Sequence, residues 1–135
     1  MHPDFVRFTI QTTPQGGACG VTAIGKEFQD NGNGDLTRRQ VDGIAFQLTY
    51  TYQAPTMRVD ELRAGSRWKD DGEWLMAIKQ NERTYAYAWL TATGYKPVNN
   101  VEAILVQASA TTRNISHVDV HFDFSNSSQC QSNPF

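Results

Sequence analysis

The chain has 135 residues, a formal net charge of −2 at pH 7, 11% aromatic and 19% charged residues. This length predicts one folded domain covering residues 1–135, and this composition excludes an intrinsically disordered chain. Lys and Arg form no run, which argues against binding to duplex DNA, and no segment approaches the roughly 18 apolar residues that a membrane span requires. The first residues lack the apolar core of a signal peptide, so we expect either a retained protein or a mature form without its leader.

The first elements in the chain are two predicted strands. Alternating apolar residues predict a strand over 5–10, and the β-prone segment 18–25 predicts a second, with the turn residues of 13–17 between them. The segment DNGNGD, residues 30–35, resembles a calcium loop in composition but lacks the bidentate Glu that such a loop needs. We therefore expect a plain turn there.

The clearest helix follows that turn. Thr37 and Gln40 have the spacing of a capping box, in which each side chain accepts a hydrogen bond from a free backbone amide of the other. Apolar residues then recur at helical spacing, at Val41, Ile44, Ala45 and Leu48. The pattern predicts a helix from Thr37 to about Tyr50 that packs one face on a core.

The next part of the chain has no clear helical or strand period before it becomes β-prone. We expect residues 55–72 to form a long loop with one short element. The segments 73–79 and 83–93 predict a hairpin about residues 80–82, with Tyr85, Tyr87 and Trp89 on one face. The nearly apolar segment 100–110 predicts a central strand.

The last predicted strand, residues 116–125, alternates between apolar and polar side chains. Val118, Val120, Phe122 and Phe124 share one face, and His117, Asp119, His121 and Asp123 share the other. The polar face has three interpretations: a solvated outer face, a catalytic or binding face, and a metal site. Ligands on one flat strand spread over about 13 Å, which is too wide for one ion, so we expect the solvated face, no metal ion and no cofactor.

The order of these elements predicts the fold class. It is α+β, with an N-terminal β-hairpin, one main helix and then a curled antiparallel β-sheet.

The two cysteines, Cys19 and Cys130, lie near opposite ends of the chain. A bridge between them is favoured and would stabilise the fold by about 4 to 5 kcal/mol in the chain-entropy model. The alternatives are two inert thiols, or a nucleophilic Cys19 with His117 or His121 as its base. Two Asn-x-Ser sequons, at Asn114 and Asn126, are compatible with secretion.

This pattern of residues resembles the fungal guanyl-specific ribonucleases of the T1 type and the secreted fungal effectors built on the same fold. The matching features are Cys19 and Cys130, the single helix, the Glu73-Trp74 pair and the histidines of the last strand. The resemblance implies a Cys19–Cys130 disulfide, a catalytic Glu73 on a sheet strand, and His117 or His121 as general acid. The family's Tyr-Pro-His segment has no counterpart, and Glu102 is among the residues where the family has an Arg.

The leading function predicted from these features is that of a secreted, disulfide-closed interaction protein of the ribonuclease-like effector type. We expect it to be non-catalytic and to bind a host protein or single-stranded RNA. The predicted binding residues are Tyr85, Tyr87, Trp89, Arg83 and Arg113. One alternative is an active ribonuclease that uses Glu73 with His117 or His121. Another is an assembly subunit that pairs through long strands such as 101–110.

Overall fold

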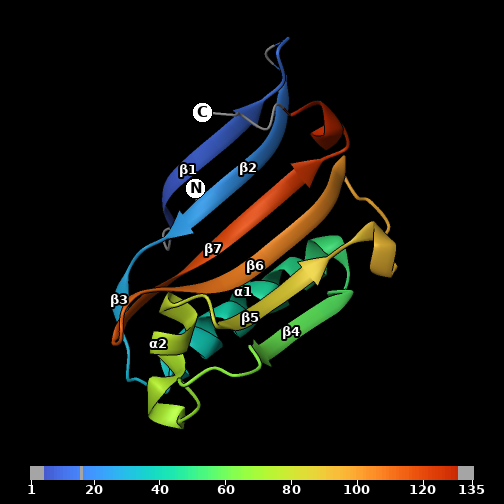
Figure 1. Ribbon diagram of the computed structural model, residues 1–135. Helices are drawn as coiled ribbons and strands as arrows, with labels where there is room; N and C mark the ends of the chain where they lie inside the picture. Colours follow the sequence, from blue (N-terminus) through green and yellow to red (C-terminus); the bar gives the residue numbers. More distant parts are fainter. Residues whose placement is uncertain (1–4, 16, 131–135) are drawn as a thin grey trace.

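The structure is a computed structural model that describes residues 5–15 and 17–130. It confirms the predicted α+β class, because N-terminal strands, one main helix and an antiparallel sheet follow in that order (Figure 1). The strands are β1 (Phe5–Thr12), β2 (Ala18–Gly25), β3 (Phe28–Gln29), β4 (Met57–Leu62), β5 (Arg83–Trp89), β6 (Val101–Thr112) and β7 (Ile115–Phe124). The helices are α1 (Asp35–Tyr52) and the short α2 (Trp74–Lys79), with single 3₁₀ turns at Asp71–Glu73, Thr91–Thr93 and Ser127–Gln129.

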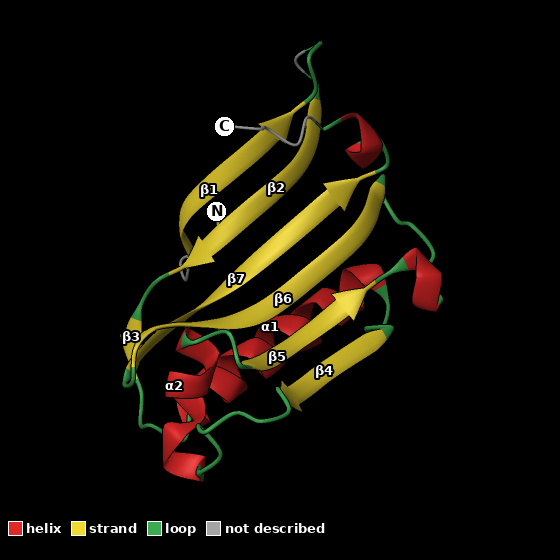
Figure 2. Cartoon of the chain, in the orientation of Figure 1, coloured by secondary structure: helices red, strands yellow, loops and turns green. Residues whose placement is uncertain are grey.

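All strands belong to one seven-stranded sheet that does not close into a barrel. The order across it is β1-β2-β7-β6-β5-β4, every pair is antiparallel, and β3 pairs with the start of β7. The N-terminal hairpin therefore lies beside the last strand of the chain, and β1 and β4 form the two edges. In Figures 1 and 2, α1 lies behind the sheet, along the half that contains β5 and β6. We call the face that α1 covers the inner face and the opposite one the outer face.

The N-terminus of α1 differs from the predicted capping box. The helix begins at Asp35, with Gly34 as its N-cap, and Thr37 lies inside it. The cap comes instead from the carboxylate of Asp30, which accepts hydrogen bonds from the backbone amides of Leu36 at 3.1 Å and Thr37 at 2.8 Å. The Thr37 hydroxyl donates to the same carboxylate at 2.5 Å. Asp30 thus satisfies amides that have no acceptor within the helix.

The turn before α1 requires glycine. Gly34 has φ 73°, a left-handed conformation, and a Cβ at this position would collide with the ring of Trp74. The segment 30–35 is therefore a plain turn, as predicted, and it brings Asp30 back to the start of the helix.

The core lies between α1 and the inner face of the sheet. Val41, Ile44 and Ala45 are buried and Leu48 is partly buried, which confirms the predicted apolar stripe. The strands contribute Ala23, Tyr85, Trp89, Ile104, Val106, Val118 and Val120 to the same cluster. Val118 and Val120 point inward, so His117 and His121 face outward.

Residues 74–79 form a helix, and the predicted strand there is wrong. Trp74, Leu75 and Ile78 are all buried in the core cluster, and their spacing is that of one helical face. The strand that pairs with β5 is instead β4, from the segment predicted to be mostly loop. Glu73 consequently ends a 3₁₀ turn and caps α2, and does not lie on a sheet strand.

Ile44→Ala should lower the free energy of unfolding by about 2 kcal/mol, near the low end for a buried Ile. Ile44 is 8% exposed and borders a groove, so water can reach part of the space that the shortened side chain leaves. Urea denaturation of both proteins measures the difference. A loss below about 1 kcal/mol would mean that α1 does not pack on the sheet through this residue.

Cys19 and Cys130 form a disulfide, as predicted, with their Cα atoms 5.7 Å apart. Both sulfur atoms are used in this bond, so Cys19 has no free thiol to act as a nucleophile. The bridge joins the start of β2 to the segment after β7 and closes nearly the whole described chain. Across residues 5–15 and 17–130, no helix has the length and apolar character that a membrane crossing needs.

Candidate functional site

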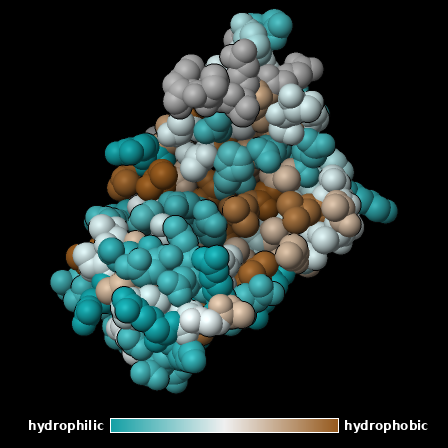
Figure 3. All heavy atoms as spheres, viewed as in Figure 1, coloured by the Kyte–Doolittle hydropathy of each residue, from teal (hydrophilic) through white to brown (hydrophobic). Residues whose placement is uncertain are grey.

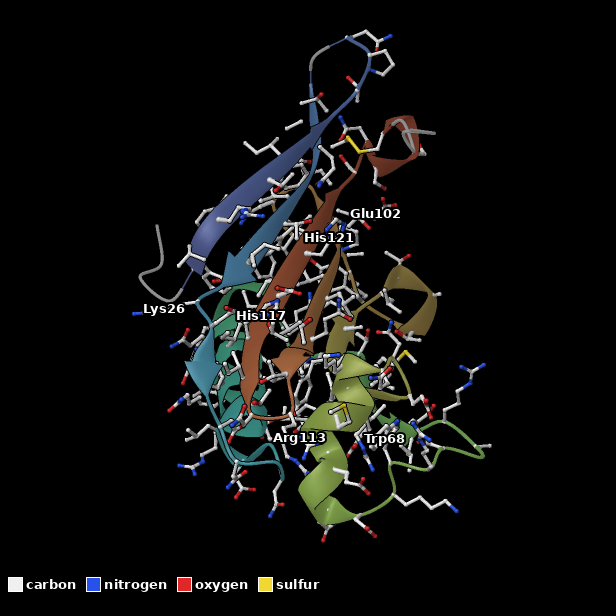
Figure 4. All side chains as sticks on the ribbon, turned by 60° about the vertical axis from the view of Figure 1, so that its left-hand side comes forward. Lys26, Trp68, Glu102, Arg113, His117 and His121 are labelled. Carbon is white, nitrogen blue, oxygen red and sulfur yellow. A yellow bond between two sulfur atoms is a disulfide. The ribbon has the colours of Figure 1, made fainter. Side chains whose placement is uncertain are left out.

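The outer face of β7 carries the predicted polar ladder. His117, Asp119, His121 and Asp123 alternate with the buried residues of the inner face, as predicted. His117 and His121 lie along β7 and Arg113 lies at the β6–β7 turn (Figure 4). Each histidine pairs with the carboxylate two residues further on, so the ladder consists of two separate His–Asp pairs.

His121 forms the more complete hydrogen-bonded arrangement of the two. Its Nδ1 lies 2.7 Å from the Thr22 hydroxyl of β2, and its Nε2 lies 2.8 Å from the Asp123 carboxylate. Thr22 and His121 are direct neighbours across the β2–β7 pair, which explains their contact. A hydroxyl, an imidazole and a carboxylate in this order resemble the nucleophile, base and orienting group of a hydrolase. The same arrangement also serves as an ordinary cross-strand contact.

His117 lies in a more enclosed environment. Its Nε2 is 3.1 Å from Asp119 Oδ1, and its side chain is 17% exposed. The hydrogen bond to Asp119 raises the pKa of His117 above 6.5, burial opposes this, and the charges of Asp119 and Glu27 add to the increase. The pair therefore favours the imidazolium form.

Asp119→Asn should lower the pKa of His117. The carboxylate is the main group that stabilises the charged ring, and an amide keeps the shape without the charge. Because the folded pKa is raised, this pair stabilises the fold below the unfolded pKa of His117, and the contribution disappears as pH rises through the folded value. NMR titration of the His117 ring protons in the variant and in the wild-type protein measures the shift. An unchanged His117 pKa would contradict the assignment.

Glu73 does not join the histidines. It precedes Trp74, which packs in the core with Tyr85 and α1, whereas both histidines project from the outer face. Within the described residues, no side-chain hydrogen bond or ion pair connects Glu73 to His117 or His121. The acid–base pair of Glu73 with His117 or His121 therefore stays a prediction.

The predicted aromatic binding face points into the core. Trp89 is fully buried and Tyr85 is 3% exposed, while Tyr87 is half-buried. Trp89 donates its indole N–H to the Gln53 carbonyl, and the hydroxyls of Tyr85 and Tyr87 both donate to Asp42 of α1. Burial, followed by the hydrogen bond to Asp42, raises the pKa of Tyr85. These rings hold α1 on the sheet, and only Tyr87 has a side accessible to a ligand.

The two predicted binding arginines lie at separate places. Arg83 pairs with Asp60 on the neighbouring strand β4, with 3.0 Å between Nη1 and Oδ1. Arg113 is exposed at the β6–β7 turn. Neither side chain forms a hydrogen bond or ion pair with His117 or His121 in the described part of the molecule. They do not form one cationic surface with the polar ladder.

An apolar groove opens on the inner face beside α1. The sequence pattern did not predict it. Its volume is about 280 Å³, and it is lined by Phe5, Phe8, Ala23, Ile44, Gln47, Leu48, Val120 and Phe122. Phe5 and Phe8 come from β1, Ala23 from β2, and Val120 and Phe122 from β7. The groove exists because α1 packs mainly over β5, β6 and β7, so the inner face of the N-terminal hairpin extends beyond the helix.

Hydrophobic side chains continue outward from this groove along β1. Phe8 is 39% exposed and Ile10 is 61% exposed, and both share the inner face with Ala23 and Val21 of β2. The outer face, which is the one viewed in Figure 3, is mostly hydrophilic with a hydrophobic band across its middle. In the sequence, the signal for the groove is the apolar alternation of residues 5–10, which predicts a strand but not what its apolar face packs against.

No metal centre is formed by the described residues, since no three His, Cys, Asp or Glu side chains gather within them. The inner groove and the outer polar ladder are thus the two candidate sites. Comparison with protein-family models, with curated proteins and with solved structures found no match for the chain.

Proposed function

We propose that this chain is a secreted, non-catalytic interaction protein whose groove binds an apolar helix of a protein partner. The observation that carries the proposal is the groove itself, an open apolar surface that the fold leaves uncovered. The disulfide supports an oxidising, extracellular location, because such bonds persist mainly in secreted proteins.

The dimensions of the sheet favour a helix as the bound element. Neighbouring strands are about 4.8 Å apart, so the two strands β1 and β2 add roughly 10 Å of width beyond those that α1 covers. Helices pack side by side at about 8 to 10 Å. The space beside α1 is therefore about one helix wide.

The chemistry of the groove favours the same element. An extended segment lying across apolar side chains would leave its backbone amides and carbonyls without hydrogen bonds, whereas a helix satisfies its own backbone. The one polar lining side chain is the exposed, uncharged Gln47. A helix with an apolar face therefore fits the groove better than a charged peptide or a nucleic acid.

Two further observations support a non-catalytic protein binder over an RNA-binding enzyme. Trp89 and Tyr85 lie in the core, where they cannot stack on bases, and within the described residues no hydrogen bond or ion pair joins Glu73 to the histidines. In this proposal the resemblance to ribonuclease-like effectors concerns the fold and the interaction role, and the partner is a host protein.

The test uses a labelled 18-residue amphipathic model helix with Leu at helical spacing, and a scrambled peptide of the same composition. Fluorescence anisotropy should show saturable binding of the first peptide only. Leu48→Asp and Gln47→Glu should each weaken binding at least tenfold, because they place a charge in the groove, while Gln80→Glu adds the same charge at the end of α2 and should not. Equal binding of both peptides, or of all variants, would refute the proposal.

A second candidate, a small hydrolase centred on His121, is favoured by its contacts with Thr22 and Asp123. Incubation with single-stranded RNA and with p-nitrophenyl acetate tests it. Turnover that His121→Ala abolishes without changing the melting temperature would establish this candidate. Our proposal predicts no turnover of either substrate above that of the His121→Ala variant.

A further inference from the structure

The two edges of the sheet differ in how they are protected. The edge strand β4 carries three charged residues among six, Arg58, Asp60 and Glu61. The other edge, β1, carries one charged residue among eight, Arg7, and contains no proline. Natural proteins usually protect exposed edges with charges, prolines or bulges, because an open edge pairs readily with another strand. The β4 edge follows this rule, and β1 follows it much less.

The unprotected edge is also where exposed hydrophobic side chains gather. Val6 is 64% exposed, Phe8 39% and Ile10 61%. Irregularities in the β1–β2 pairing occur between Phe5 and Arg7 and between Gln11 and Thr12, so residues 7–11 form a regular segment. This segment of β1 has the length and composition of a strand that pairs on both sides.

We propose that β1 pairs with β1 of a second copy of this chain, antiparallel and about a twofold axis. The pairing would join the two sheets into one, with both α1 helices on the same face. It rests on the exposed edge of β1 and not on the proposed function.

A second copy is favoured as the occupant because the strand is complementary to itself. Opposite residues in an antiparallel pair share a face of the sheet. The twofold axis therefore passes midway between one residue of β1 and the same residue of the second copy. With the axis at Phe8, the two Phe8 rings meet and Arg7 lies opposite Thr9 of the second copy. With the axis at Thr9, Phe8 meets Ile10 and Arg7 lies opposite Gln11. Only an axis at Arg7 would bring two like charges together, and that register is disfavoured.

The registers centred on Phe8 and on Thr9 have the same energetic basis. They place apolar side chains against apolar ones on the inner face and polar side chains against polar ones on the outer face, where Thr9 adjoins Thr22. Both also supply backbone hydrogen bonds along residues 7–11, which pair with β2 on one side and with no other described strand.

Sedimentation equilibrium of the full chain, across micromolar to millimolar concentrations, tests the proposal. We expect a concentration-dependent rise from 15.2 kDa to about twice that mass. Ile10→Lys should remain at the monomer mass, because in either register it places an ammonium group against the apolar edge of the second copy, and circular dichroism should show an unchanged fold since Ile10 is exposed. Met57→Lys, a matched change of an exposed residue on β4, should associate like the wild type.

Cross-linking provides a second readout that does not depend on a destabilised variant. Thr9→Cys should give a covalent dimer with a short bismaleimide, and Glu61→Cys on β4 should not. A wild-type chain that stays monomeric throughout, or a dimer that persists in Ile10→Lys, would overturn the proposal. The mass of the chain in solution and its binding of the model helix are separate measurements, so the two proposals fail separately.

Discussion

Replacing Cys19 and Cys130 together with alanine should lower the free energy of unfolding by about 4 to 5 kcal/mol. The bridge spans 111 residues, so its loss releases nearly the whole chain in the unfolded state and raises the entropy of that state. Urea denaturation, monitored by the fluorescence of the buried Trp74 and Trp89, measures the change.

The reducing agent dithiothreitol supplies the matched control. It should destabilise the wild-type protein by the same amount and leave the double variant unchanged. If the wild-type protein and the double variant unfold at the same urea concentration under oxidising conditions, the bridge does not contribute to stability as we argue.

The second large effect is expected at Asp30. Asp30→Ala should lower the free energy of unfolding by about 3 to 4 kcal/mol, more than an ordinary helix cap. The carboxylate accepts bonds from the amides of Asn31, Leu36 and Thr37 and from the Thr37 hydroxyl, which in turn contacts the buried Ser116 of β7 at 2.5 Å. Removing it leaves several buried donors without an acceptor. Thermal denaturation measures the loss, with the exposed Asp71→Ala as the control.

The same residue should make stability depend on pH. Burial by itself would raise the pKa of Asp30, but the hydrogen bonds from Thr37, Leu36 and Asn31 together outweigh it and hold the pKa below 3.8. A depressed folded pKa stabilises the fold above the unfolded value, and this contribution is lost as pH falls through the folded pKa. The stability difference between wild type and Asp30→Asn should therefore be constant near neutral pH and shrink below about pH 4. A difference that grows on acidification would contradict this assignment.

Local patterns predicted the elements whose residues repeat with one clear period. The two faces of β7 follow from strict alternation, and α1 follows from the spacing of Val41, Ile44 and Ala45. Residues 74–79 were misassigned because a short apolar segment fits a strand or a helix equally well. The cap of α1 was misassigned because Asp30 reaches the helix through a turn, which no fixed spacing reveals.

In the candidate site too, the features that one strand determines could be predicted, and those that depend on packing between elements could not. The outward direction of His117 and His121 follows from alternation along one strand, and the structure places both there. Their distance from Glu73 depends on which face α2 packs against, and that is decided by the buried Trp74, Leu75 and Ile78. The groove exists because the N-terminal hairpin extends beyond α1. The hairpin lies there because β2 pairs with β7, a strand from the other end of the sequence, and no local pattern reveals that pairing.

The measurement that tests the central claim most directly is a set of intermolecular NOEs between the amphipathic model helix and the methyl groups of the protein. We expect contacts from the Leu side chains of the peptide to Leu48, Val120 and Ala23, which line the groove. We expect none to Val59 and Leu62 of β4, outside the groove. Contacts to β4, or a bound peptide with no contact to the groove methyl groups, would contradict it.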